Sequence, residues 1–177
     1  MASILSRKEG AVKQNTKKLT ALALTISFAL ILSYIESRIP ALVAIPGIKV
    51  GLANIAVIFA LYKFGAKEAI LVSILRILLV SMMFGSPVSM IYSIAGAVLS
   101  LGSMILLKRL TPLREVTISV VGGVMHNLGQ IATASLMLST NVVAYYLPFL
   151  ILSGTIAGIA VGVVSALLIR RVPLNFQ

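Results

Sequence analysis

Long apolar runs with few charged residues dominate this sequence. They are separated by short polar or proline-containing segments, and we expect helices over residues 19–35, 51–62, 68–83, 88–107, 116–138 and 142–169. A run of about 20 apolar residues is long enough to cross a bilayer as an α-helix. The pattern therefore predicts an all-α integral membrane protein with six transmembrane helices.

The amino-acid composition also indicates a protein that lies in a lipid bilayer. Of the 177 residues 59% are hydrophobic and only 11% are charged, whereas about a quarter of a soluble domain is charged. A water-soluble fold of this size cannot hide so much apolar surface, but lipid is itself an apolar solvent. The chain has no cysteine, which excludes disulfides and thiolate metal sites.

We expect one transmembrane domain over residues 19–171, between a basic cytoplasmic tail at 1–18 and a short cytoplasmic tail at 172–177. The proline- and glycine-containing segment 36–50 is predicted to be a loop or re-entrant stretch. The run 51–62 is short for a full span, so its helix either starts in the preceding segment or stays short.

Pro148 near the start of the last run either bends that helix or marks its true beginning.

Lysine and arginine concentrate on one predicted side of the membrane, which holds 12 of the 15 basic residues. The positive-inside rule makes this side cytoplasmic, and it includes both termini of a multi-pass protein in the cell membrane. The bias also explains the net charge of +11 without nucleic acid. The cytoplasmic set is Arg7, Lys8, Lys13, Lys17, Lys18, Lys63, Lys67, Lys108, Arg109, Arg114, Arg170 and Arg171.

Arg76 lies near the middle of the third predicted helix. A charge at the centre of a bilayer costs at least about 2.5 kcal/mol on insertion scales, so Arg76 is expected to face protein or water. It is either a structural residue bonded to backbone carbonyls or an anion ligand inside a cavity.

A second group of polar residues interrupts the fifth predicted helix. His126 and Gln130 are four residues apart and share a face, and Asn127 lies beside them. Because the chain has no second histidine, no cysteine and no aspartate, we expect neither a metal site nor a cofactor.

By depth, several polar residues can converge in the outer half of the bundle, which predicts a pocket that is open to the outside and closed toward the cytoplasm. Its cations favour a small anionic ligand. Glu36 is expected to pair with Arg38 at the rim or to contact a cationic part of the ligand, and no acidic residue is expected in the layer of Arg76. The predicted binding residues are Glu36, Arg38, Lys49, Asn54, Arg76, His126, Asn127 and Gln130.

Small residues recur at four-residue spacing in two of the predicted helices. Gly154, Gly158 and Gly162 form a double GxxxG pattern, which favours close contact with a neighbouring helix. The first helix carries Ala21, Thr25 and Ala29 at the same spacing. That face serves either packing within the chain or docking of a partner protein.

Four segments carry a family resemblance: PGIKVGLANI at 46–55, LRILLVSMMFGS at 75–86, YSIAGAVLSLGSM at 92–104 and VVGGVMHNLGQ at 120–130. They resemble the bacterial membrane family labelled heptaprenyl diphosphate synthase component I, also called the Gx transporter family, over residues 20–170.

That family is similar to the S components of energy-coupling factor (ECF) transporters, which are six-helix proteins with both termini in the cytoplasm. The resemblance implies an ECF coupling subunit and its ATPases as partners, docked on the small-residue face of the first helix. The chain has no GxxxxGK[ST] loop of its own.

Catalysis of prenyl chain elongation is not expected, because it needs aspartate-rich Mg²⁺ sites and this chain has no aspartate and scattered glutamates. Three functions stay open. A polar outer cavity favours a transporter subunit that binds a small anionic solute. A lateral apolar slot ending at Arg76 favours a non-catalytic membrane partner in isoprenoid or quinone metabolism. A fully packed interior favours a scaffold for a flavin or electron-transfer complex.

Overall fold

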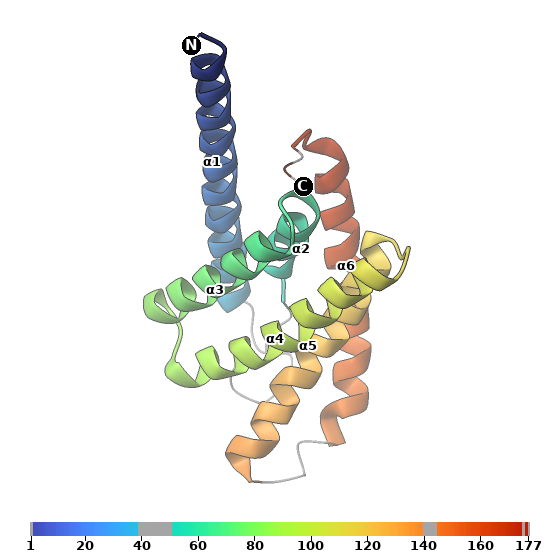
Figure 1. Cartoon of the computed structure of the whole chain (residues 1–177). Helices are drawn as coiled ribbons and strands as arrows, with labels where there is room; N and C mark the ends of the chain where they lie inside the picture. Colours follow the sequence, from blue (N-terminus) through green and yellow to red (C-terminus); the bar gives the residue numbers. More distant parts are fainter. Residues whose placement is uncertain (1, 39–50, 140–144, 175, 177) are drawn as a thin grey trace.

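The computed structural model describes residues 2–38, 51–139, 145–174 and 176. Regular structure in these residues is helical throughout, which confirms the all-α expectation for this part of the chain (Figure 1). The helices are α1 (Ala2–Arg38), α2 (Asn54–Lys63), α3 (Ala66–Met83), α4 (Pro87–Leu110), α5 (Glu115–Leu138) and α6 (Leu147–Arg171).

The largest difference from the predicted boundaries is in α1. This helix begins at Ala2 and not at Leu19, and it continues without a break through the basic segment. Lysine, arginine and glutamine are good helix formers, so the loss of apolar residues does not end the helix. Its first turns project beyond the rest of the bundle in Figure 1.

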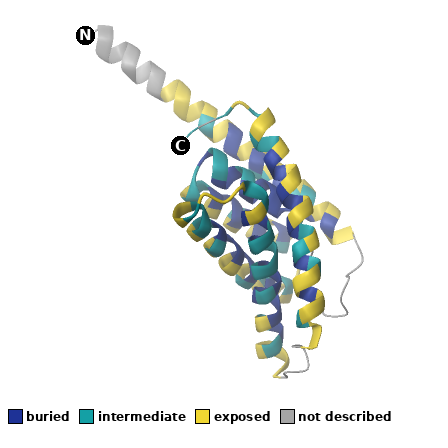
Figure 2. Cartoon of the chain, turned by 90° about the vertical axis from the view of Figure 1, so that its right-hand side faces the viewer, coloured by how far each residue is buried: buried dark blue, intermediate teal, exposed yellow. Residues whose placement is uncertain are grey.

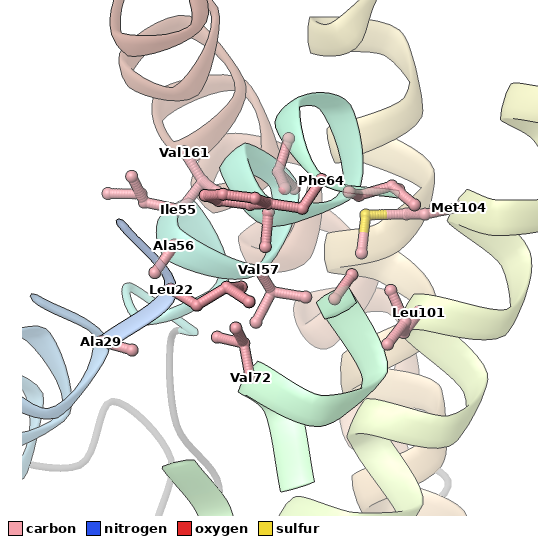
Figure 3. Packing of buried hydrophobic residues seen from close by; sticks show 14 of the residues in the cluster. Leu22, Ala29, Ile55, Ala56, Val57, Phe64, Val72, Leu101, Met104 and Val161 are labelled. Carbon is pink, nitrogen blue, oxygen red and sulfur yellow. The ribbon is translucent and has the colours of Figure 1, made fainter. Parts of the chain in front are cut away.

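α2 is short but central. It has 10 residues and is therefore about 15 Å long, roughly half the thickness of a hydrocarbon core. None of its side chains is exposed, because the other helices surround it (Figure 3). The core around α2 includes Leu22, Ala29, Val57, Ile58, Leu61, Val72, Leu101, Met104, Ile118 and Val161.

The glycine face of α6 lies against α5. A Cβ on Gly158 would come within 2.6 Å of the Val120 Cα, and one on Gly162 within 2.8 Å of the Val116 Cα. The close approach also allows the Ser119 hydroxyl to donate to the Gly158 carbonyl at 2.8 Å. These glycines therefore act in packing within the chain.

The small-residue face of α1 is also covered by this chain. Ala21, Thr25 and Ala29 are all buried, and Ala21 and Ala29 belong to the core around α2. The Thr25 hydroxyl donates to the Ala21 carbonyl at 2.7 Å within the helix. The face therefore packs largely within the chain, but Ala21 and Thr25 also line an open groove of about 260 Å³, and docking of a partner there stays a prediction.

Contacts between distant segments bring basic regions to one end of the bundle. Lys18 Nζ lies 2.5 Å from Glu68 Oε1, and Lys108 Nζ donates to a carbonyl oxygen of α2 at 2.8 Å. The Phe176 amide donates to the Lys63 carbonyl at 2.9 Å. The start of α1 and the C-terminal segment both lie on this side in Figure 1.

Among the described residues, three helices are long and apolar enough to cross a membrane: α1 over Val12–Arg38, α4 and α6. α3 is apolar but carries the three charged residues Lys67, Glu68 and Arg76, and the polar stripe of α5 lowers the hydropathy of that helix. Many large apolar residues are exposed, such as Val98 at 65%, and Figure 2 shows exposed residues in yellow along the outer sides of several helices. Such a surface is typical of a chain in lipid, while the six-span topology stays a prediction.

Candidate functional site

The guanidinium of Arg76 is buried in the middle of α3. The residue is 7% exposed, and its Nε has no hydrogen-bond partner among the described residues. Burying a charged donor is costly unless it is paired, and an unsatisfied buried donor commonly marks the place of a water, an ion or a ligand. The side chain therefore faces protein, as predicted for a charge at this depth.

Arg76 lines a small polar cavity of about 20 Å³. A cavity of this size holds about one water molecule. Its walls come from α1, α3, α4, α5 and the residue that leads into α2, so it lies where these elements meet. The lining residues are Ser33, Glu36, Gly51, Arg76, Ile77, Val80, Ser93 and His126. We call this the polar cavity.

Glu36 belongs to this cavity, which corrects the expectation that Arg76 has no acidic neighbour in its layer. Glu36 is 6% exposed, and its Oε1 accepts a hydrogen bond from the Gly51 amide. Arg38 is exposed instead, with its guanidinium 5.9 Å from the centroid of the Tyr34 ring. Because residues two apart on a helix face roughly opposite sides, α1 cannot bring Glu36 and Arg38 together.

His126 fills the space between α4 and the turn before α2. A Cβ on Gly96 would lie 2.8 Å from the imidazole Cε1 and Nδ1, and a Cβ on Gly51 would lie 3.9 Å from its Cδ2. Gly51 has a φ of 89°, a left-handed conformation that favours glycine. Its missing side chain also makes room for Asn54, whose Nδ2 would be 2.9 Å from that Cβ.

Asn127 faces α6, whereas His126 faces the polar cavity. Its Nδ2 donates to the Leu150 carbonyl at 2.8 Å and to the Ser153 hydroxyl at 3.3 Å. The side chain thus ties α5 to α6 and is not part of the polar cavity.

Gln130 lies one turn beyond His126 and is fully buried. Its amide nitrogen and oxygen have no partner among the described residues, and it is not among the residues that line the polar cavity. Lys49 lies outside the described residues. Of the predicted binding set, the structure brings together Glu36, Arg76 and His126, with Asn54 beside them.

Sequence reasoning missed the two serines of the polar cavity. Ser33 precedes Glu36 by three residues, a spacing that places both on one face of α1. Ser93 lies in the same way three residues before Gly96 on α4. Helical spacing from a known site residue was the signal that could have found them.

A larger apolar groove lies beside the polar cavity, between α3 and α4. Its volume is about 460 Å³, within the range of about 300–1,000 Å³ that is common for ligand pockets. Ile77 lines both the groove and the polar cavity. Other walls of the groove include Ile70 and Ile74 of α3 and Ile94, Val98 and Ile105 of α4.

Within the described residues, no three histidine, cysteine, aspartate or glutamate side chains gather to hold a metal ion. The groups that the polar cavity offers for recognition are a buried guanidinium, an imidazole and a carboxylate.

A family model described as heptaprenyl diphosphate synthase component I matches residues 25–168. The matched range runs from α1 into α6 and includes every residue that lines the polar cavity and the groove. The match confirms the resemblance read from the sequence. No curated protein and no solved structure matches the chain.

Proposed function

The chain belongs to the heptaprenyl diphosphate synthase component I family, and we propose that it is a non-catalytic membrane component that binds the anionic end of a prenyl diphosphate beside a separate synthase. One observation carries this proposal. Arg76 is buried with an unbonded Nε in a cavity shared with His126 and Glu36.

The chemistry of these side chains suits a phosphate group. A guanidinium presents a planar set of donors that matches phosphate oxygens, and its attraction for an anion is far stronger at low dielectric than in water. His126 adds a second polar group from α5. Without a bound anion, the Glu36 carboxylate is the negative charge that lies next to Arg76.

The volume of the polar cavity defines what binding requires. About 20 Å³ holds a water molecule but not a phosphate. A diphosphate therefore needs the contact between the Glu36 carboxylate and the Gly51 amide to open. Moving Glu36 aside exposes Arg76 to the incoming anion.

The glutamates support a non-catalytic role. Glu36 accepts from Gly51, Glu68 pairs with Lys18, and Glu115 begins α5 far along the chain. Mg²⁺ on a diphosphate needs clustered carboxylate oxygens, and the chain contains no aspartate. The bond-forming step then belongs to a separate synthase subunit.

A substrate-binding subunit of an ECF-type transporter is the second candidate. It is favoured by the separation of polar and apolar layers, since fully buried Ile58, Met104 and Ile118 lie in the core away from the polar cavity. The open groove that Ala21 and Thr25 line together with Phe59 and Leu168 is the surface on which we expect a coupling subunit to dock. Co-purification with an ATPase module from native membranes would support this candidate.

The test uses the full chain in phosphatidylcholine nanodiscs with radiolabelled farnesyl diphosphate and inorganic diphosphate. Arg76→Gln keeps most of the side-chain volume but removes the charge. It is expected to weaken the binding of both probes at least about tenfold, or 1.4 kcal/mol. Arg109→Gln makes the same change at an exposed position and is the matched control. Unchanged binding of both probes by a folded Arg76→Gln protein would contradict the proposal.

A further inference from the structure

The polar cavity lies at one end of the apolar groove. Arg76 and Ile77 are consecutive on α3, and Ser93 and Ile94 are consecutive on α4. In each pair the first residue lines the polar cavity and the second lines the groove. The two spaces are thus neighbours along both helices, with Ile77 as their common wall.

The groove extends from this end toward the basic end of the bundle. From Ile94 to Ile105 along α4 it covers three turns, or about 16 Å. The walls are apolar except for Ser73. Two small residues, Ala97 and Gly102, lie among the α4 residues that line it, and a Cβ on Gly102 would meet no atom within 4 Å.

The lining of the groove suits an apolar chain, because ten of its eleven residues are apolar and Ser73 is the exception. Water is a poor occupant, because apolar walls offer it no hydrogen bonds.

We propose that this groove holds the apolar tail of an amphiphile whose phosphate head lies at Arg76, so that the ligand enters sideways from the bilayer. The charge of Arg76 at one end and the apolar walls beyond it match that combination of head and tail. The inference rests on the proposed anion site and adds to it the single apolar chain as the second part of the ligand.

The experiment separates tail from head with three probes in phosphatidylcholine nanodiscs: inorganic diphosphate, farnesyl diphosphate and dodecyl phosphate. Gly102→Phe places an aromatic side chain at a groove position where a Cβ meets no atom within 4 Å, and because it replaces a poor helix former, we expect the protein to fold. Leu106→Phe, on the same helix but outside the groove and 57% exposed, is the matched control.

We expect the wild-type protein to bind farnesyl diphosphate at least about tenfold more tightly than inorganic diphosphate, because burying apolar carbons is favourable. Gly102→Phe removes that advantage and leaves inorganic diphosphate within about twofold, and Leu106→Phe changes neither. If Gly102→Phe weakens the binding of dodecyl phosphate as much as that of farnesyl diphosphate, the groove accepts any single-chain phosphate lipid. If Gly102→Phe weakens only the binding of farnesyl diphosphate, the groove is specific for a prenyl chain.

Two results would overturn the inference while leaving the anion site intact. In the first, Gly102→Phe binds farnesyl diphosphate as the wild type does. In the second, Gly102→Phe changes the number of copies per disc without changing probe binding, which would assign the groove to a second copy of the chain. Failure of the wild type to bind inorganic diphosphate, with no effect of Arg76→Gln on any probe, would instead reject the proposed function.

Discussion

The imidazole of His126 packs directly against the backbone of Gly96, so closely that a Cβ at position 96 would lie 2.8 Å from its Cε1 and Nδ1. α4 therefore decides where this α5 side chain points. The other side of the ring faces Gly51, whose own Cβ would lie 3.9 Å from Cδ2. Two glycines on separate elements thus hold the imidazole at the polar cavity.

Gly96→Ala is expected to displace the imidazole and weaken diphosphate binding several-fold. Gly102→Ala is the matched control on the same helix, because its new Cβ meets no atom, and it is expected to stabilise the protein by about 0.5–1 kcal/mol. Diphosphate binding and thermal unfolding of both variants in one nanodisc preparation check this. Equal affinity in the two variants would show that Gly96 does not position His126.

Gly158→Leu is expected to lower the free energy of unfolding by about 1–3 kcal/mol, because its Cβ would already lie 2.6 Å from the Val120 Cα. Val163→Leu adds bulk on the same helix at a position that is 46% exposed, and its effect should stay within about 0.5 kcal/mol. Unfolding in detergent measures both. A similar loss in the two variants would contradict close α5–α6 packing.

Asn127→Leu is expected to reduce stability and leave ligand binding unchanged. The substitution removes the bond from Nδ2 to the Leu150 carbonyl, and bonds of this kind between membrane helices contribute about 0.6–1.7 kcal/mol. His126→Leu, in contrast, is expected to abolish ligand binding, because it removes the imidazole from the polar cavity. If the Asn127→Leu protein is fully stable but does not bind the ligand, Asn127 belongs to the ligand site after all.

Reporter fusions after Lys67, Arg114 and Arg171 are expected to read cytoplasmic, and fusions after Gly85 and Ser139 external. The reasons are the charge bias and the contacts that gather Lys18, Lys108 and Phe176 at one end of the bundle. Alkaline phosphatase and green fluorescent protein fusions report the two sides. An external signal at Arg114 would exclude six spans.

Local signals predicted the helix boundaries well where a cap or a proline sets them. The Gly-Ser-Pro turn at 85–87 separates α3 from α4, and the Ser86 hydroxyl caps α4 by accepting from the Ser89 amide at 3.1 Å. Pro148 lies in the first turn of α6, which resolves the alternative in favour of a helix start. No such signal marks Leu19, and α1 runs past it.

The sequence by itself determined the class of the protein, its apolar segments, the charge bias between its ends and the family, because hydropathy, charge and short motifs are local properties. Only the tertiary structure decided that Glu36 and not Arg38 joins Arg76, and that Asn127 turns toward α6. It also decided that a groove opens between α3 and α4. These outcomes depend on how each helix is rotated and which helices it contacts. Close contacts at positions such as Gly96 and Gly158 set both, and the hydrophobic periodicity of a single segment does not reveal them.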